Sequence, residues 1–322
     1  MKILVISGLL GAGKTTFIQY LAKKTQEKFV ILENDVAGAN IDKHRLEANP
    51  DLNIWELTEG CICCQSNTDF RTSVIAIANA LDPEYLVIEP TGVGYLGNII
   101  HELNAITYER IQLLAPITIV DGMQYNYAPA NYPDLFDNQV QAASRIIVSK
   151  TETLSVEERE DIRRRLTLLN PLADIYADGY LDWPKKWYQD LLQVFIDGSR
   201  VPKVDEKFEV ETVTYQNVHL TSVQSLVIML DNLVRGHFGQ IVRSKGAVQC
   251  SSQLIRFDVV NQSYVITEAD TTEENTIVFI GQDIDGETLA NFLEIHAQEK
   301  HSQFHHHNHE HSEEFRECDS HK

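Results

Sequence analysis

A glycine-rich segment near the start of the chain restricts its fold more than any other feature. Residues 8–15 read GLLGAGKT and match the pattern G-x-x-x-x-G-K-[ST]. The segment follows the apolar run KILVIS (2–7) and leads into TTFIQYLAKK (15–24), which has a helical pattern. In such a turn, backbone N–H groups surround phosphates, and the dipole of the following helix adds to the attraction. The sequence predicts a strand, a phosphate-binding loop (residues 8–15, the phosphate loop) and a helix. The alternative is a glycine-rich turn that binds nothing.

The phosphate loop and a second apolar run supply the expected catalytic side chains. We expect Lys14 to reach the β- and γ-phosphates and the Thr15 hydroxyl to bind Mg²⁺. Glu89 ends an apolar strand in VIEPTG (87–92), where a carboxylate can assist with Mg²⁺ or the attacking water. Gly92 lets the backbone approach the γ-phosphate. The alternative for Glu89 is an acid that only caps a strand end. The expected phosphate and Mg²⁺ contacts are Gly8, Gly11, Ala12, Gly13, Lys14, Thr15, Thr16 and Gly92.

Short apolar runs alternate with helical patterns over the first two hundred residues. Strands are expected at 2–7, 28–34, 53–57, 84–90, 115–122 and 144–150. Helices are expected near 14–26, 68–80, 95–107, 134–143 and 155–169. Continuous apolar strands separated by helices indicate an α/β fold with a doubly wound, mostly parallel sheet. Ligands of such sheets bind beyond the carboxyl ends of the strands.

The segment SKTE (149–152) follows the apolar run SRIIV and is the expected base-reading site. P-loop GTPases typically have Asn or Thr, then Lys, any residue and Asp here, and the aspartate accepts the guanine N–H groups. This chain has Ser149, Lys150 and Glu152. Glutamate has the same charge on a side chain one methylene longer, so the sequence favours GTP and leaves ATP open. The alternative is a turn before a helix.

Three of the five cysteines lie within TEGCICCQS (58–66). Thiolates of Cys61, Cys63 and Cys64 on one tight loop can bind a soft or borderline cation such as Zn²⁺, Cu⁺ or Co²⁺. Three ligands leave a tetrahedral site one short, which suits catalysis or transfer better than permanent structure. Two alternatives stay open: a redox pair of Cys61 and Cys64, and a structural zinc completed elsewhere in the chain.

Composition limits the partners. The 322 residues carry a net charge of −20, from 27 basic and 47 acidic side chains. Nucleic acid and anionic membranes would be repelled by that field, so neither is expected as a partner. No apolar run is long enough to span a bilayer. The first residues read as a buried strand instead of an export signal, because cleavage there would destroy the phosphate loop. We therefore expect a cytoplasmic, reducing location, in which clustered cysteines indicate metal or redox chemistry.

The pattern changes after Pro202. An alternating run at 208–220, an amphipathic helix at 222–236, apolar runs at 253–260, 263–269 and 275–282, and a final helix at 285–298 predict a small α+β domain. The expected domains are a nucleotide-binding domain at 1–200, an α+β domain at 205–299 and a tail at 300–322.

The last 22 residues hold seven of the twelve histidines. This low-complexity tail is expected to be disordered. Neutral imidazoles suit Zn, Co, Ni and Cu, so the tail would gather metal loosely and raise its concentration near the cysteines. An interrupted cloning tag is the alternative. The expected tail ligands are His305, His306, His307, His309 and His311.

Taken together, these motifs resemble the CobW-like family of P-loop GTPases, which includes metallochaperones acting in zinc homeostasis, cobalamin synthesis and nitrile hydratase maturation. The resemblance covers nearly the whole chain and rests on GLLGAGKTT (8–16), ILENDVAG (31–38), EGCICC (59–64), VIEPTG (87–92), SKTE (149–152), VRSKGAV (242–248) and VFIGQDIDGETL (278–289). It implies metal delivery under nucleotide control, with Glu33 as a fourth metal ligand and Asp35 on a switch loop. Glu152, and NDVAGAN (34–40) in place of N-E-F-G, depart from the family pattern.

The sequence thus predicts a GTP-hydrolysing metallochaperone. It would use GTP and Mg²⁺, bind zinc, cobalt or another divalent transition metal, and deliver the metal to a client protein. The alternatives are an NTP-dependent kinase or ligase with a structural zinc, and a non-enzymatic metal buffer. A nickel-insertion GTPase is disfavoured by the long second domain. A homo-oligomer is compatible with the sequence.

Overall fold

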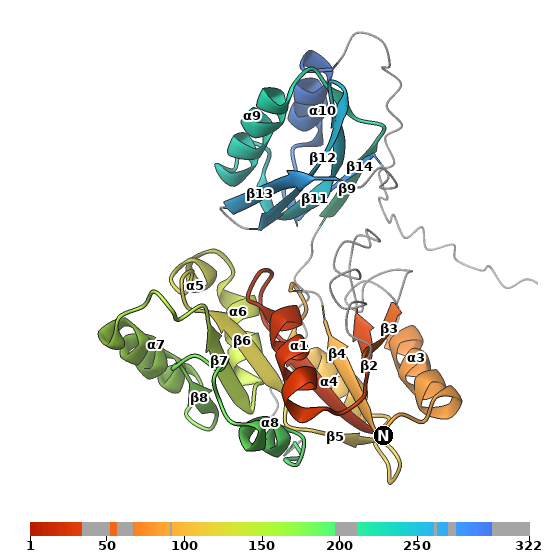
Figure 1. Ribbon diagram of the computed structural model, residues 1–322, viewed down its shortest axis with the longest axis vertical. Coiled ribbons are helices and arrows are strands. Elements are labelled where there is room, and N and C mark those ends of the chain that lie inside the picture. Colours follow the sequence, from red (N-terminus) through yellow and green to blue (C-terminus); the bar gives the residue numbers. More distant parts are fainter. Residues whose placement is uncertain are drawn as a thin grey trace, which may run out of the picture. The chain divides into compact units, whose positions relative to one another are not determined.

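The computed structural model describes residues 1–33, 52–56, 67–90, 92–196, 211–260, 263–269 and 275–297, with the backbone alone for 33, 52–56 and 67–69. The chain divides into two compact units, Met1–Val210 and Glu211–Lys322 (Figure 1). Each unit has its own sheet. The predicted tail at 300–322 lies outside the described residues.

The first unit is built on a parallel sheet with the strand order β3-β2-β4-β1-β6-β7-β8, and β5 adds to β1. The strands are β1 (Lys2–Ser7), β2 (Phe29–Glu33), β3 (Leu52–Glu56), β4 (Tyr85–Glu89), β5 (Gln112–Leu113), β6 (Ile117–Asp121), β7 (Arg145–Ser149) and β8 (Asp174–Tyr176). The first strand in sequence, β1, lies in the middle, between β4 and β6. The chain therefore turns to opposite sides of β1, and in sheets of this kind ligands bind at the carboxyl end of the strand where this reversal occurs.

Helices cover both faces of this sheet (Figure 1). On one face lie α3 (Asn67–Ala80), α4 (Leu96–Asn104), α6 (Pro133–Gln141) and α7 (Val156–Leu169); on the other lie α1 (Lys14–Thr25) and α8 (Lys185–Leu191). The short helix α5 (Tyr127–Asn131) precedes α6.

The central strand β1 shows why the sheet is buried on both faces. Ile3 and Val5 join the core under α3 and α4, whereas Leu4 and Ile6 join the core under α1. All four side chains are at most 1% exposed. Burial of each contributes about 1.5–3 kcal/mol, as an upper estimate, because removing apolar surface from water is favourable. The predicted doubly wound sheet is confirmed.

The described residues of the second unit form a mostly antiparallel sheet and two helices. Its strand order is β13-β12-β11-β14-β9, and β10 adds in parallel to β11. The strands are β9 (Glu211–Gln216), β10 (His219–Leu220), β11 (Gln240–Cys250), β12 (Gln253–Val260), β13 (Ser263–Glu268) and β14 (Thr276–Gln282). The helices α9 (Val223–Val234) and α10 (Gly286–Ile295) share one core with the sheet. The predicted α+β domain is confirmed as a fold; its exact limits stay a prediction.

Candidate functional site: the phosphate loop and its surroundings

The phosphate loop connects the carboxyl end of β1 to α1. Gly8 has φ +140, and a Cβ there would stand 2.3 Å from the Ile119 carbonyl oxygen of β6. Any side chain would therefore collide with the neighbouring strand in a conformation that only glycine adopts readily. The loop is thus pressed against β6 before it enters α1.

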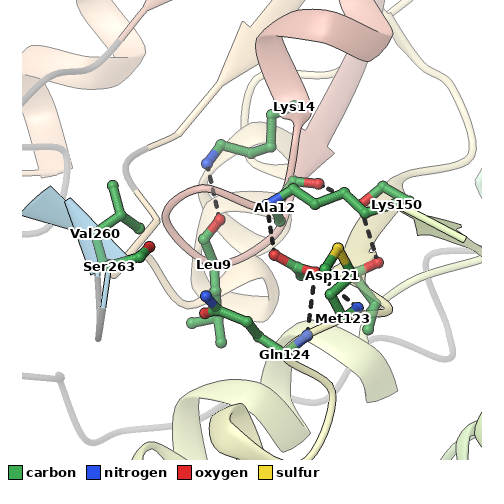
Figure 2. A network of polar contacts seen from close by, with 11 residues as sticks. Leu9, Ala12, Lys14, Asp121, Met123, Gln124, Lys150, Val260 and Ser263 are labelled. Atoms are coloured by element: carbon green, nitrogen blue, oxygen red, sulfur yellow. Dashed lines mark hydrogen bonds and ion pairs between the residues drawn. The ribbon is translucent and has the colours of Figure 1, made fainter. Parts of the chain in front are cut away.

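Lys14 begins α1 and turns back over the loop (Figure 2). Its side chain is 7% exposed, and Nζ donates to the carbonyl oxygens of Gly8 at 3.1 Å and Leu9 at 3.4 Å. An ammonium group held among backbone carbonyls and N–H groups of one loop is suited to binding a phosphate oxygen.

Thr15 and Glu89 meet beside the phosphate loop. The Thr15 hydroxyl lies 3.0 Å from Glu89 Oε1 and 3.2 Å from Oε2. The two residues come together because β4 pairs with β1 in the sheet, so Glu89 at the end of β4 reaches the start of α1. A hydroxyl and a carboxylate are oxygen donors of the kind that Mg²⁺ prefers. The predicted residues therefore fit a magnesium ion.

The loop after β4 lies against the phosphate loop. A Cβ on Gly92 would stand 2.3 Å from the backbone nitrogen of Leu10 and 2.8 Å from its Cα. Backbone atoms cannot give way as a flexible side chain can, so glycine is required at this position. The structure thus brings Gly92 next to Leu10 of the phosphate loop. Its role with the γ-phosphate stays a prediction.

The predicted base-reading segment follows β7 and also contacts the phosphate loop. The Ser149 hydroxyl is 2% exposed and donates to the carbonyl oxygen of Ala12 at 2.6 Å and towards that of Val120 at 3.2 Å. This side chain therefore ties the end of β7 to the phosphate loop. Glu152 is exposed.

Asp121 is a residue that the sequence reasoning missed. Its Oδ2 pairs with Lys150 Nζ at 2.6 Å, and its Oδ1 accepts the backbone N–H groups of Met123 at 3.0 Å and Gln124 at 3.2 Å (Figure 2). Lys150 itself has φ +54, in the left-handed region. Asp121 ends β6 as Glu89 ends β4, so an acid at the end of a buried strand was the signal available in the sequence.

The turn after β8 is a second missed feature. A Cβ on Gly179 would stand 3.2 Å from Thr151 Oγ1, so this turn lies beside the segment 149–152. Burial, followed by the negative charge of Glu152, raises the pKa of Tyr180 to about 12. The turn that holds Gly179 is therefore a neighbour of the predicted base-reading segment.

The predicted metal ligands Cys61, Cys63, Cys64, His305, His306, His307, His309 and His311 lie outside the described residues. The structure describes only the backbone of Glu33, which ends β2 in register with Glu56 of β3 and Glu89 of β4. The three strands therefore end at one level, and the cysteine segment begins directly after β3. In the part of the chain that the structure describes, no three His, Cys, Asp or Glu side chains are grouped to hold a metal.

Two cysteines belong to the second unit: Cys318 lies outside the described residues, and Cys250 is a core residue. Cys250 is buried, and burial raises the pKa of its thiol to about 11. A neutral, buried thiol is a poor nucleophile and metal ligand. Among the described residues, no helix has the length and apolar character needed to cross a membrane.

Sequence models of two known domains match the chain. The CobW/HypB/UreG nucleotide-binding domain matches residues 2–177, and the C-terminal domain of the cobalamin synthesis protein CobW matches residues 210–295. The chain belongs to the CobW/HypB/UreG family. The predicted resemblance to CobW-like P-loop GTPases is confirmed.

Relatives of this CobW-family chain include proteins named as zinc chaperones and a zinc-regulated GTPase. The zinc chaperone YjiA of Escherichia coli is 24% identical over 303 residues, which cover 87% of this chain and 94% of YjiA. The zinc chaperone YeiR of the same organism is 31% identical over 163 residues, about half of either chain. The zinc-regulated GTPase metalloprotein activator 1 of Dictyostelium discoideum is 23% identical over 302 residues, covering 76% of this chain and 62% of that protein.

Solved structures resemble the chain more weakly. Zinc-bound YjiA GTPase from Escherichia coli covers 92% of this chain and 99% of its own, with 18% identity and a TM-score of 0.43. Nickel-bound HypB from Helicobacter pylori covers 59% of this chain and 83% of its own, with 20% identity and a TM-score of 0.43.

Proposed function

We propose that this CobW-family protein hydrolyses GTP and uses the nucleotide state to deliver zinc to a client protein. The observation that carries the proposal is the pair of Thr15 and Glu89, 3.0 Å apart beside the phosphate loop. This pair links a nucleotide site to the strand edge from which the cysteine segment starts. The names of the relatives, zinc chaperones and a zinc-regulated GTPase, support zinc as the cargo.

The residues of the phosphate loop divide the work on the phosphates. Backbone N–H groups of Gly8, Gly11, Ala12, Gly13 and Thr16 bind phosphate oxygens, and Lys14 neutralises the β- and γ-phosphates. Thr15 and Glu89 would hold Mg²⁺, which would supply positive charge to the phosphate oxygens. Gly92 donates its N–H to the γ-phosphate. The alternative role for the carboxylate of Glu89 is to assist the attacking water.

The segment 149–152 reads the base. Glu152 accepts the guanine N–H groups, and Lys150 lies on the base, where its pair with Asp121 fixes its position. Ser149 contributes by holding this segment against Ala12 of the phosphate loop. One buried hydroxyl therefore couples the segment that contacts the base to the loop that contacts the phosphates. This coupling supports a preference for nucleotides that make both sets of contacts, as a guanine nucleotide would.

Zinc is the cargo and not a resident cofactor. Cys61, Cys63 and Cys64 hold it, with Glu33 as the fourth ligand and the tail histidines as a loose supply. The carboxyl ends of β2, β3 and β4 lie at one level of the sheet, which supports coupling of this site to Glu89. Contacts with the γ-phosphate order the neighbouring loops, and this ordering then changes the coordination of the zinc. A metal-requiring client is the expected partner, and we further propose domain limits of 1–200, 205–299 and 300–322.

The hydrolytic half of the proposal is tested by steady-state phosphate release from Mg²⁺·GTP. We expect Thr15→Ala and Glu89→Gln each to lower kcat about 100-fold or more, because each removes a group that acts on developing charge. Glu84→Gln is the matched control: Glu84 is an exposed acid just before β4, far from its carboxyl end. Phosphate transferred to a molecule other than water would indicate the kinase or ligase alternative.

The delivery half is tested by anaerobic Co²⁺ titration with Zn²⁺ back-competition. The full chain is titrated without nucleotide, with Mg²⁺·GDP and with a non-hydrolysable Mg²⁺·GTP analogue. Thiolate-to-cobalt charge-transfer absorption should disappear in Cys63→Ala, and the metal affinity should differ between nucleotide states, because linkage is reciprocal. Equal affinity in all three states would make the metal structural. Metal transfer that survives Lys14→Ala would indicate a metal buffer.

A further inference from the structure

Helix α6 reaches the loop after β4 with two buried amide side chains. Gln139 is 1% exposed, and its Nε2 donates to the carbonyl oxygens of Gly94 at 3.0 Å and Gly92 at 3.3 Å. The two hydrogens of one amide can thus hold both ends of the short segment Gly92–Gly94. This segment lies outside any helix or strand, so its carbonyl groups depend on side chains for buried partners.

The neighbouring amide holds the next part of the same loop. Asn138 is 3% exposed, and its Oδ1 accepts the backbone N–H of Gly97 at 3.1 Å. Gly97 is the second residue of α4, where N–H groups have no partner inside the helix. Tyr95, at the cap position of α4, supplies no side-chain acceptor. Asn138 of α6 therefore supplies the cap from a separate helix.

The position of Gln139 is itself fixed relative to the phosphate loop. The Thr118 hydroxyl of β6 donates to the Gln139 carbonyl oxygen at 2.7 Å. Thr118 is in register with Ser7, the last residue of β1. The backbone of Gly92 lies against Leu10 on its other side. The loop after β4 is thus held between the phosphate loop on one side and α6 on the other. The phosphate loop follows β1, and α6 is bonded to β6, which pairs with β1.

We propose that Gln139 is a positioning residue for the γ-phosphate. It acts through Gly92: by holding the carbonyl groups of Gly92 and Gly94, it sets the place at which the Gly92 N–H meets the nucleotide. The inference rests on the proposed function, in which that N–H contacts the γ-phosphate. It deepens that function by naming α6 as the element that senses whether GTP or GDP is bound.

The proposal predicts a difference between two nucleotides and not a general loss of binding. Gln139→Met keeps the length of the side chain and removes both donors. The affinity for a non-hydrolysable Mg²⁺·GTP analogue should fall about tenfold, since two hydrogen bonds that hold the loop are lost. The affinity for Mg²⁺·GDP should stay the same, because GDP has no γ-phosphate. A purely structural role would lower both affinities together.

The experiment is calorimetric titration of the full chain with both nucleotides. Gln141→Met is the matched control, because Gln141 lies on the same helix two residues later and is exposed. Gln139→Asn is the second variant: it keeps an amide in the buried site and shortens its reach by one methylene. It should shift the ratio of the two dissociation constants in the same direction, also in the event that Gln139→Met does not fold.

The outcomes separate the two proposals. A ratio that changes in the Gln139 variants and not in Gln141→Met supports the positioning role. An unchanged ratio in a folded Gln139 variant overturns that role and leaves the GTPase proposal standing. Wild-type protein that binds neither nucleotide overturns both.

Discussion

The two sheets of this protein place their polar side chains differently. In the first unit the central strands β1, β4, β6 and β7 are buried along most of their length, and polar groups gather at the carboxyl ends: Glu89 ends β4, Asp121 ends β6 and Ser149 ends β7. In the second unit polar groups lie within the strands. Arg243 of β11 pairs with Asp258 of β12 at 3.5 Å, and Lys245 of β11 is fully buried.

The difference teaches where each unit can do chemistry. Parallel strands bring all their ends to one edge, so residues that are far apart in sequence meet around the phosphate loop. The antiparallel sheet alternates strand directions, so its ends carry short connections in place of one shared edge. For example, Cys250 of β11 faces Gln253 of β12 across a tight turn. The nucleotide site is therefore expected in the first unit alone, and the following changes test that separation.

The largest effect is expected from a glycine pair. Gly8→Ala should lower the unfolding free energy of the first unit by about 3 kcal/mol. The alanine would have to adopt φ +140, and its Cβ would clash with the carbonyl oxygen of Ile119. Gly286→Ala in the second unit should be neutral or slightly stabilising, since nothing lies within 4 Å of the added Cβ. Tryptophan fluorescence in urea measures the first unit, because Trp55, Trp183 and Trp187 all precede residue 211.

The next effect concerns the base side of the site. Asp121→Asn keeps the acceptor for the Met123 and Gln124 N–H groups and removes the charge that holds Lys150. We expect GTP and GDP both to bind about tenfold more weakly, since a partly exposed charge pair is lost. This equal loss contrasts with the selective loss expected for Gln139→Met.

Asp190→Asn is the control for that change, because Asp190 is exposed on α8. If Asp121→Asn leaves both dissociation constants at the wild-type values, Lys150 does not need its partner to bind nucleotide.

Two helix caps give a smaller effect, one in each unit. Ser155 caps α7 in a capping box with Glu158, and Ser222 caps α9 through the N–H of Ser225. Each serine-to-alanine change should lower the unfolding free energy of the unit that contains it by about 1 kcal/mol. Only Ser155→Ala should move the fluorescence transition, whereas circular dichroism should detect both. A Ser222→Ala variant that shifts the fluorescence transition would show that the units unfold together.

The smallest effect near neutral pH is expected from the titration of buried groups. Alkaline pH should lower the stability of the two units, beginning at a different pH for each. Burial raises the pKa of Tyr85 and Tyr180 in the first unit to about 12, and that of Cys250 in the second to about 11. In each case the unfolded chain loses its proton first, so stability falls as the pH rises from the ordinary pKa to the folded one. The decline should begin near pH 9 for the second unit, where a thiol ordinarily titrates, and near pH 10 for the first.

Urea midpoints measured between pH 7 and 11.5 by fluorescence and circular dichroism check this order. Cys250→Ala should move the onset in the second unit towards pH 10, the ordinary pKa of Tyr215.

Much of the first unit could be predicted because its signals are local. The apolar run 2–7 became β1 with identical bounds, and VEEREDIRRRL became α7 behind a serine cap. The strand β11 was not predicted as a strand. Gly246 and the buried Lys245 interrupt its apolar pattern and weaken its tendency to form a strand. Pairing with β12 and β14 stabilises the strand in spite of these two residues. That stabilisation comes from residues distant in sequence and has no local signature.

The candidate site shows the same division. The phosphate loop and Glu89 follow from motif and strand position, and the structure brings Thr15 and Glu89 together. Asp121 and Gln139 carry no motif of their own. Their importance comes from partners 29 residues away for Asp121 and 45 to 47 residues away for Gln139, which only the folded sheet brings close. The cysteine and histidine ligands stay predictions from composition and spacing.

The central place of β1 has a consequence for synthesis on the ribosome. Lys2 pairs with Tyr85 and Ile6 with Ile117, so β1 emerges long before the strands with which it pairs. At ordinary translation rates this delay is roughly 6 to 20 seconds. During that time the apolar run KILVIS has no sheet to join and is open to chaperones or to pairing with another nascent chain. The β11–β12 hairpin of the second unit closes within a few residues of its own turn. The half of the molecule with the nucleotide site is thus the half most exposed to misfolding while it is being made.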